Sequence, residues 1–173
     1  MSETIEFEPL DIVLLTISDT RTEADDRSGR VLRERVEAAG HRVLSRGIVA
    51  DDRYLIRAEV SRWIADEVCR VVITTGGTGL TGRDVTPEAV RILFDREIEG
   101  FGELFRSLSY GGIGTSTLQS RALAGVANGT VVFCLPGSPG ACRDAWDQII
   151  VHQLDRRTRP CNLVEIMPRM REC

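Results

Sequence analysis

The sequence predicts a three-layer α/β domain, and three observations lead to that class. Short apolar runs alternate with amphipathic stretches along the chain, as strands and helices alternate in α/β folds. With 173 residues, the chain is long enough for one domain with a sizeable core. Charged residues make up 28% of it, and its apolar runs are too short to cross a bilayer. We therefore expect one domain over residues 1–173, with residues 1–9 and 163–173 as terminal extensions.

The first half of the chain is predicted to alternate strands and helices. Residues 12–17 read as a buried strand, followed by a polar loop over 18–27 and a helix capped by Ser28 and ending at Gly40. A second strand covers 41–49, and Asp51 or Asp52 caps the next helix. The apolar residues of that helix should face the sheet; they are Ile56, Val60, Trp63, Ile64 and Val68. Residues 71–75 form the third strand and run directly into a glycine-rich loop.

The second half begins with Thr86-Pro87-Glu88, which predicts a helix capped by Thr86. We expect a helix over 97–108, a flexible break over 110–114 and another helix over 116–126. Residues 131–135 form a further buried strand, followed by a loop and a helix to about residue 154. The tail carries apolar residues that could form an edge strand or contact another subunit; they are Leu163, Val164, Ile166 and Met167.

The charged residues exclude several kinds of chemistry. The 22 basic and 26 acidic side chains give a net charge of −4, and all 22 basic residues are arginine. Without lysine, neither a Schiff base nor a Walker A phosphate contact is available. Backbone N–H groups, arginine or a metal would therefore have to hold any phosphate. The mild acidity gives no reason to expect nucleic acid or an anionic membrane as a partner.

The amino-terminal segment and the cysteines indicate a reducing compartment. Residues 1–9 are acidic and lack the basic start of a secretory signal, so we expect a cytoplasmic protein. Five cysteines without C-x-x-C spacing are interpreted as buried or incidental thiols rather than disulfides or a metal site; they are Cys69, Cys134, Cys142, Cys161 and Cys173.

Three loops follow predicted strands and are expected to share one rim. They cover residues 18–21, 75–79 and 136–139, and ligands in open α/β sheets bind beyond the carboxyl ends of the strands. Glycine at 76, 77 and 79 lets the backbone approach a bound group and point N–H donors at it, although a tight turn alone could use the same glycines. Ser138 and Pro139 begin a helix whose N-terminus could accept a phosphate, or could simply be capped.

Acidic residues accompany two of the predicted loops. Asp51 and Asp52 follow the second strand, and Asp84 follows the glycine-rich loop. Magnesium takes one or two carboxylates together with phosphate oxygens and water, so these positions predict a magnesium site beside a phosphate site. Helix capping by Asp51 or Asp52 and turn formation by Asp84 are the structural alternatives.

Taken together, these segments resemble the MoaB/MogA family of molybdenum cofactor biosynthesis proteins. The resemblance runs from about residue 10 to residue 162, and residues 112–121 and 157–162 look more like its MoaB members. The matching motifs are Thr75-Gly76-Gly77-Thr78-Gly79, Asp84-Val85-Thr86-Pro87-Glu88-Ala89, Gly100-Phe101-Gly102-Glu103-Leu104-Phe105-Arg106, Ser120-Arg121-Ala122 and Pro136-Gly137-Ser138-Pro139.

The resemblance implies a Rossmann-like α/β/α sandwich with a mostly parallel sheet, assembled as a trimer or, as in MoaB-like members, a hexamer. The implied activity is adenylylation of molybdopterin with Mg-ATP, which gives molybdopterin-AMP for a partner protein that inserts molybdate or tungstate. Such chemistry depends on positioning and charge stabilisation, so it does not require lysine. A noncatalytic molybdopterin-binding or scaffold protein is the alternative, because the resemblance extends to MoaB-like members with the activity and to others without it. An unrelated nucleotide-binding α/β protein is a third possibility.

By the same resemblance, Asp51 and Asp84 are assigned to magnesium and catalysis, although Ala50-Asp51-Asp52 leaves the choice between Asp51 and Asp52 open. The expected substrate contacts are Ser18, Asp19, Thr75, Gly76, Gly77, Thr78, Gly79, Arg83, Glu88, Ser120, Arg121, Pro136, Gly137 and Ser138.

Overall fold

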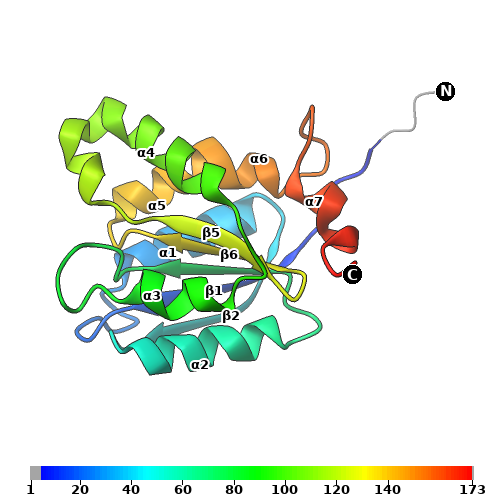
Figure 1. The fold of residues 1–173 in the computed structure, drawn as a ribbon. Helices are drawn as coiled ribbons and strands as arrows, with labels where there is room; N and C mark the ends of the chain where they lie inside the picture. Colours follow the sequence, from blue (N-terminus) through cyan, green and yellow to red (C-terminus); the bar gives the residue numbers. More distant parts are fainter. Residues whose placement is uncertain (1–4, 173) are drawn as a thin grey trace.

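The computed structural model describes residues 5–172, in which six strands form one mostly parallel sheet (Figure 1). The spatial order is β2-β1-β3-β6-β5-β4. β1 pairs in parallel with β2 and β3, and β3 pairs in parallel with β6, whereas β5 runs antiparallel to β6 and β4. The strands are β1 (Asp11–Ile17), β2 (Arg42–Val49), β3 (Val71–Thr75), β4 (Arg96–Glu97), β5 (Leu123–Ala127) and β6 (Thr130–Leu135).

Helices cover both faces of this sheet. A π-helical turn, Trp146–Ile150, joins α5 to α6, and 3₁₀ turns cover Arg91–Leu93, Gly114–Gln119 and Met167–Arg169. The α-helices are α1 (Arg27–Ala38), α2 (Arg53–Ile64), α3 (Thr86–Val90), α4 (Glu99–Ile113), α5 (Pro139–Ala145), α6 (Val151–Gln153) and α7 (Leu163–Ile166).

Alternation along the strands divides the core into two halves. In β1, Ile12 and Leu14 pack with residues of α1, α4 and α5, while Val13 and Leu15 pack on the other face with residues of α2 and α3. Successive side chains of a strand point to opposite faces, so a strand buried on both sides is apolar throughout. The predicted three-layer α/β/α sandwich with a mostly parallel sheet is confirmed.

The chain reverses its direction across the sheet at β1. It passes from β1 to β2 on one side and then returns to β3 on the other side of β1, with α1 and α2 on opposite faces. The connections that follow the neighbouring strands β1 and β3 therefore leave toward opposite faces of the sheet. Such a switch point leaves a crevice beyond the carboxyl ends of the strands, where ligands bind in this class of fold.

Two predicted helix caps are wrong. Asp26, not Ser28, caps α1, since its side chain accepts a hydrogen bond from the Gly29 N–H. Thr86 is the first residue of α3, and its hydroxyl instead donates to the Gly76 carbonyl at 2.9 Å. Both hydroxyls face an adjacent loop, so tertiary contacts outweigh the local capping preference.

The segment between β3 and β6 differs most from the sequence prediction. α4 runs to Ile113 through the expected break at 110–114, and it ends at Gly114, whose φ is +59°. The helix expected over 116–126 is instead a 3₁₀ turn followed by β5, and residues 96–97 form the short strand β4.

Smaller corrections concern the end of α2 and the structure of the tail. α2 ends at Ile64, so Val68, expected to face the sheet, is exposed. Of the two alternatives for the tail, the edge strand is wrong, because residues 163–166 form α7, which buries Val164; the contact with another subunit stays a prediction.

Three of the cysteines are part of the buried core. Cys69, Cys134 and Cys142 are buried free thiols and Cys161 is an exposed one, while Cys173 lies outside the described residues. Within residues 5–172 no group of three potential metal-ligating side chains occurs. No helix in this part of the chain has the length and hydropathy needed to cross a membrane.

Candidate functional site

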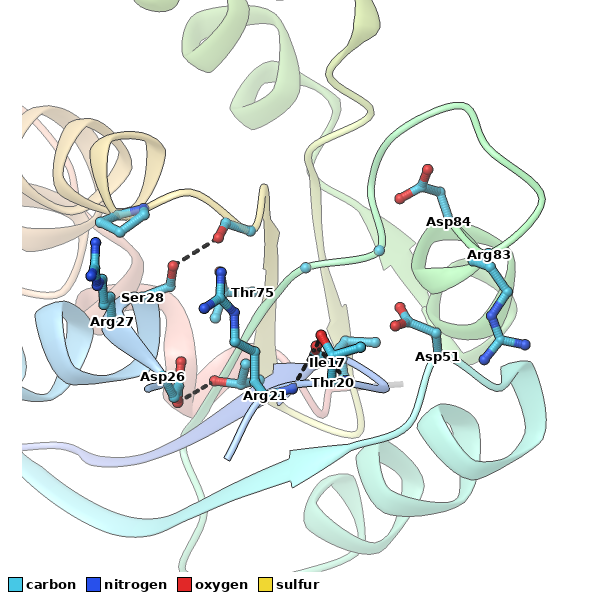
Figure 2. Close-up of a pocket in the computed structure, with 16 residues that line it drawn as sticks. Ile17, Thr20, Arg21, Asp26, Arg27, Ser28, Asp51, Thr75, Arg83 and Asp84 are labelled. Carbon is cyan, nitrogen blue, oxygen red and sulfur yellow. Dashed lines mark hydrogen bonds between the residues drawn. The ribbon is translucent and has the colours of Figure 1, made fainter. Parts of the chain in front are cut away.

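A polar cavity of about 440 Å³ lies at the switch point, and we call it the switch-point cavity (Figure 2). The end of β1 and its following loop form one wall, and Thr75, Gly76 and Gly77 form another. Asp51, Arg83 and Asp84 lie on one side of the cavity, whereas Arg21, Asp26 and Arg27 lie on the opposite side (Figure 2). The cavity therefore presents carboxylates and guanidinium groups to the same interior.

The glycine loop between these groups has no room for side chains. Gly76 and Gly77 have φ values of +109° and +66°, in the region that favours glycine. A Cβ on Gly76 would lie 2.3 Å from the Ile17 carbonyl oxygen, and one on Gly77 would lie 2.3 Å from the Thr86 hydroxyl oxygen. Thr86 holds the loop from behind by donating its hydroxyl to Gly76 and its N–H to Gly77. The glycines thus bring the backbone next to the cavity in a fixed conformation.

Asp51 is held by a reciprocal pair of hydrogen bonds to Asp19. The Asp19 N–H donates to Asp51 Oδ2 at 3.0 Å, and the Asp51 N–H donates to Asp19 Oδ1 at 3.0 Å. Asp19 also forms an ion pair with Arg83. Partial burial raises the pKa of Asp51, and the negative charges of Asp19 and Asp84 raise it further. Its neighbour Asp52 instead caps α2, accepting from the Tyr54 and Leu55 N–H groups at 2.8 and 2.9 Å.

Asp84 is held by its own loop. Its carboxylate accepts hydrogen bonds from the Thr81 N–H at 2.8 Å and the Thr81 hydroxyl at 2.6 Å. Burial alone would raise the pKa of Asp84, but these bonds, the Gly79 backbone N–H and the charge of Arg121 lower it below the ordinary value. Asp84 is therefore ionised at neutral pH without any bound cation.

A buried ion pair stiffens the opposite wall of the cavity. The Asp26 carboxylate, 1% exposed, accepts from the Arg46 guanidinium at 2.8 Å, the Thr16 hydroxyl at 2.8 Å and the Gly29 N–H at 2.9 Å. Ser28 next to it donates to the Gly137 carbonyl at 2.8 Å. These contacts tie the start of α1 to β1, β2 and the loop after β6, so this wall is a structural part of the site.

A second cavity, of about 520 Å³, adjoins the first, and we call it the helix-side cavity. It lies between α4, the 3₁₀ turn after it and the loop that begins α5. Phe105 and Ile113 supply apolar surface, while Ser109, Ser116 and Gln119 supply polar groups. Gly77, Asp84 and Gly137 line both cavities. The site is therefore one bipartite space with a shared seam at these three residues.

Thirteen of the sixteen site residues predicted from the sequence line this bipartite space. The switch-point cavity contains Ser18, Asp51, Thr75, Gly76, Gly77, Arg83, Asp84 and Gly137. The helix-side cavity contains Gly77, Thr78, Gly79, Asp84, Ser120, Pro136, Gly137 and Ser138.

Asp19, Glu88 and Arg121 line neither cavity. Arg121 is directed at the chain itself: its guanidinium donates to the Gly79 carbonyl at 2.7 Å and to the carbonyl of Asp84, and it pairs with Glu88. These bonds engage Nε and both terminal nitrogens of Arg121, and its expected phosphate contact stays a prediction. The geometry gives Arg121 and Glu88 a positioning role for the Asp84 loop.

Sequence reasoning missed the α4 side of the helix-side cavity. Phe105, Ser109 and Ser116 lie four and seven residues apart, and the first two share one face of α4. The glycines at 111 and 112 predicted a break there and concealed this face. Arg27 and Asp26 were also missed, since the helix was expected to begin at Ser28.

Comparisons with known proteins agree with this geometry. A family model described as "Probable molybdopterin binding domain" matches residues 13–156, most of the chain. The chain belongs to this molybdopterin-binding family. It is 60% identical over 157 residues to molybdenum cofactor biosynthesis protein B of Escherichia coli K12, covering 91% of this chain and 92% of the relative.

Solved structures of family members superimpose closely. A crystal structure of a molybdenum cofactor biosynthesis protein B matches with a TM-score of 0.86 at 44% identity, covering 96% of this chain and 98% of that one. The tungsten cofactor synthesizing protein MoaB of Pyrococcus furiosus matches with a TM-score of 0.79 at 34% identity, covering 95% and 99%. The predicted family and its MoaB branch are confirmed, and the chain is a molybdenum cofactor biosynthesis family protein.

Proposed function

We propose that this chain binds molybdopterin and adenylylates it with ATP. An oxygen of the terminal phosphate of molybdopterin attacks the α-phosphorus of ATP and forms a new P–O bond. The bond from that phosphorus to the oxygen bridging the β-phosphorus breaks, and its electron pair leaves with pyrophosphate. The products are molybdopterin-AMP and pyrophosphate.

One observation carries this proposal: two carboxylates and a fixed glycine loop border the seam between two adjoining cavities. Asp84 lines both cavities and Asp51 lines the switch-point cavity beside it. A reaction that joins two phosphate-bearing substrates needs their phosphates to meet at one place, with the rest of each molecule on a different side. The seam at Gly77, Asp84 and Gly137 supports that arrangement.

The carboxylates fit a magnesium ion brought by the nucleotide. Mg²⁺ uses one or two carboxylates with substrate phosphate oxygens and water, and Asp51 and Asp84 supply two without a larger cluster among the described residues. When bound, the ion neutralises phosphate charge. The raised pKa of Asp51 fits a group whose ionised form gains from a nearby cation. The chain itself orients the phosphates with backbone donors of the glycine loop and with Arg83.

The helix-side cavity suits the pterin. Phe105 and Ile113 offer apolar surface to a flat ring, and Ser109, Ser116 and Gln119 offer hydrogen bonds to its polar edge. The polar switch-point cavity then takes the nucleotide phosphates.

The proposed activity also implies assembly and cellular context. Exposed apolar side chains on α4 and the following turn support a homo-oligomer, either a trimer or a hexamer; they are Leu104, Leu108, Tyr110, Ile113 and Leu118. In the proposed function, the product molybdopterin-AMP passes to a molybdenum-insertase partner in the cytoplasm.

The direct test is to incubate the purified full chain with molybdopterin, ATP and magnesium. We expect molybdopterin-AMP and pyrophosphate in equal amounts by mass spectrometry, and none after magnesium is removed with EDTA. Molybdopterin binding without product would contradict the enzyme and support the noncatalytic binding or scaffold protein. Tight ATP binding without any pterin binding would overturn both.

A further inference from the structure

Not every arginine of this chain has a carboxylate partner, and four of those without one line a single cavity and the groove beside it. Among the described residues, twelve arginines form ion pairs with carboxylates. Four that do not are Arg21, Arg27, Arg30 and Arg143, and all four line the switch-point cavity or a groove beside it. In a chain with more acidic than basic residues, a concentration of unpaired cations leaves a local positive potential.

The groove lies between α1 and α5, has a volume of about 550 Å³, and is here called the arginine groove. Arg27, Arg30 and Arg143 line it, all three exposed. Within residues 5–172, the side chains of Arg27 and Arg143 make no hydrogen bond or ion pair, and the side chain of Arg30 donates only to the Ala24 carbonyl at 2.8 Å. Most of their N–H donors are therefore available to a ligand.

The carboxylate in the groove does not neutralise these arginines. Glu34 lies one helical turn beyond Arg30, at the spacing where ion pairs form along a helix, yet the two side chains are not paired. Elsewhere in α1 the same spacing does pair Arg33 with Glu37 at 3.0 Å. The remaining lining is small or apolar, with Val31, Pro139 and Gly140, so the space between the guanidinium groups is open.

The arginine groove opens onto the proposed reaction site. Arg27 and Pro139 line both the groove and the switch-point cavity. Figure 2 shows Arg21 and Arg27 on the side of that cavity away from Asp51 and Asp84. A polyphosphate whose α-phosphate lies near the carboxylates can therefore extend its other phosphates toward the arginines.

We propose that the arginine groove binds the pyrophosphate group that leaves during adenylyl transfer. This inference rests on the proposed function. When the bond between the α-phosphorus and the bridging oxygen breaks, the electron pair stays on pyrophosphate and its negative charge increases. Guanidinium groups bind phosphate oxygens in a two-pronged manner and stabilise that charge without giving up a proton. Three of them, from two helices, offer more donors than a single phosphate group can accept, which favours a diphosphate.

The test is calorimetric titration of inorganic pyrophosphate into the full chain in EDTA, so that no metal takes part. Wild type should bind pyrophosphate more tightly than inorganic phosphate. In the double variant Arg27→Gln/Arg143→Gln we expect pyrophosphate affinity to fall about tenfold or more for each arginine, since each loses a charged hydrogen bond. Both side chains are exposed, so the variants should unfold at the wild-type temperature.

The matched control is Arg96→Gln in β4, at the amino end of the parallel strands and likewise without an ion pair. It removes the same charge from the chain and should leave pyrophosphate affinity unchanged. Equal weakening by Arg96→Gln, or no weakening in the double variant, would overturn the inference. If pyrophosphate binds with this arginine dependence while wild type forms no molybdopterin-AMP, the groove stands and the proposed function fails.

Discussion

The loop after β2 and the loop after β3 each bring one aspartate to the same cavity, but they hold it in opposite ways. Asp84 receives hydrogen bonds from Thr81 within its own loop, and its pKa is lowered although burial alone would raise it. Asp51 is bound by the Asp19 N–H, and burial with the neighbouring charges of Asp19 and Asp84 raises its pKa.

The difference shows that one residue type can have opposite pKa shifts within one site. Asp84 is a fixed negative charge, because its hydrogen bonds to Thr81 favour the ionised form. Asp51 holds its charge against partial burial and the neighbouring charges of Asp19 and Asp84. The pKa of a carboxyl depends on the balance of desolvation, hydrogen bonds and charges, and here that balance differs between two loops of one cavity.

The largest effect is expected from removing the fixed charge. Asp84→Asn should lower adenylyl-transfer turnover about 100-fold or more, because electrostatic groups placed at the reacting phosphates contribute on that scale. Single-turnover formation of molybdopterin-AMP measures it, and molybdopterin binding should change little. Asp66→Asn is the control: Asp66 also accepts backbone N–H bonds, from Val68 and Cys69, but outside both cavities. Equal losses in both variants would show that Asp84 has no special role.

The second prediction concerns the pH dependence of magnesium affinity. A carboxylate must be ionised to bind a metal, so affinity should fall about tenfold per pH unit once the pH is below the pKa of Asp51. That pKa lies above the ordinary value of 3.8, whereas the pKa of Asp84 lies below it, so Asp51 is the first to protonate on acidification. Calorimetric titrations with Mg²⁺ over a pH series test this. In Asp51→Asn the affinity should be weaker and the fall should begin only at lower pH; an unchanged profile would contradict the assignment.

A third prediction separates the two charges next to Asp51. The charge of Asp19 raises the pKa of Asp51, and the charge of Arg83 lowers it. Asp19→Asn should therefore lower the Asp51 pKa and Arg83→Gln should raise it, and both changes should be small because both neighbours are exposed to solvent screening. Carboxyl NMR titration in EDTA measures both. Shifts of the same sign would show that the comparison of the two loops rests on the wrong charges.

The parallel part of the fold was predictable because its information is local. β1 and β3 are apolar runs, and β1, β2 and β3 are each followed by a helix. The glycines and prolines of loops 75–79 and 136–139 favour a small set of backbone conformations. These loops also gave most of the site. The seam was accessible to sequence reasoning because parallel strands bring their carboxyl ends to one edge.

The antiparallel part was not predictable, because distant contacts determine it. Residues 123–127 are apolar and could form a helix alone, but as β5 they pair with β6 and are buried throughout. Gly111 and Gly112 suggested a break, yet α4 continues through them because packing of Phe101 and Phe105 onto the sheet outweighs the cost of two glycines. The role of Arg121 was hidden for the same reason, since its acceptors lie 37 and 42 residues away.

The smallest predicted effect resolves which of two adjacent aspartates belongs to the site. Asp52→Ala should destabilise the fold by about 1 kcal/mol, because its carboxylate caps α2 through the Tyr54 and Leu55 N–H groups. Asp51→Asn should not lower stability at neutral pH: its folded-state pKa is raised, so its ionised form opposes folding above that pKa and neutralisation removes the penalty. Denaturant unfolding at pH 7 compares the two. The two variants should rank in the opposite order for magnesium affinity, which should stay near the wild-type value in Asp52→Ala and be weaker in Asp51→Asn. If Asp52→Ala instead abolished magnesium binding while the fold stayed intact, Asp52 would be the metal ligand. The carboxylate that the loop after β2 brings to the site would then be Asp52 and not Asp51.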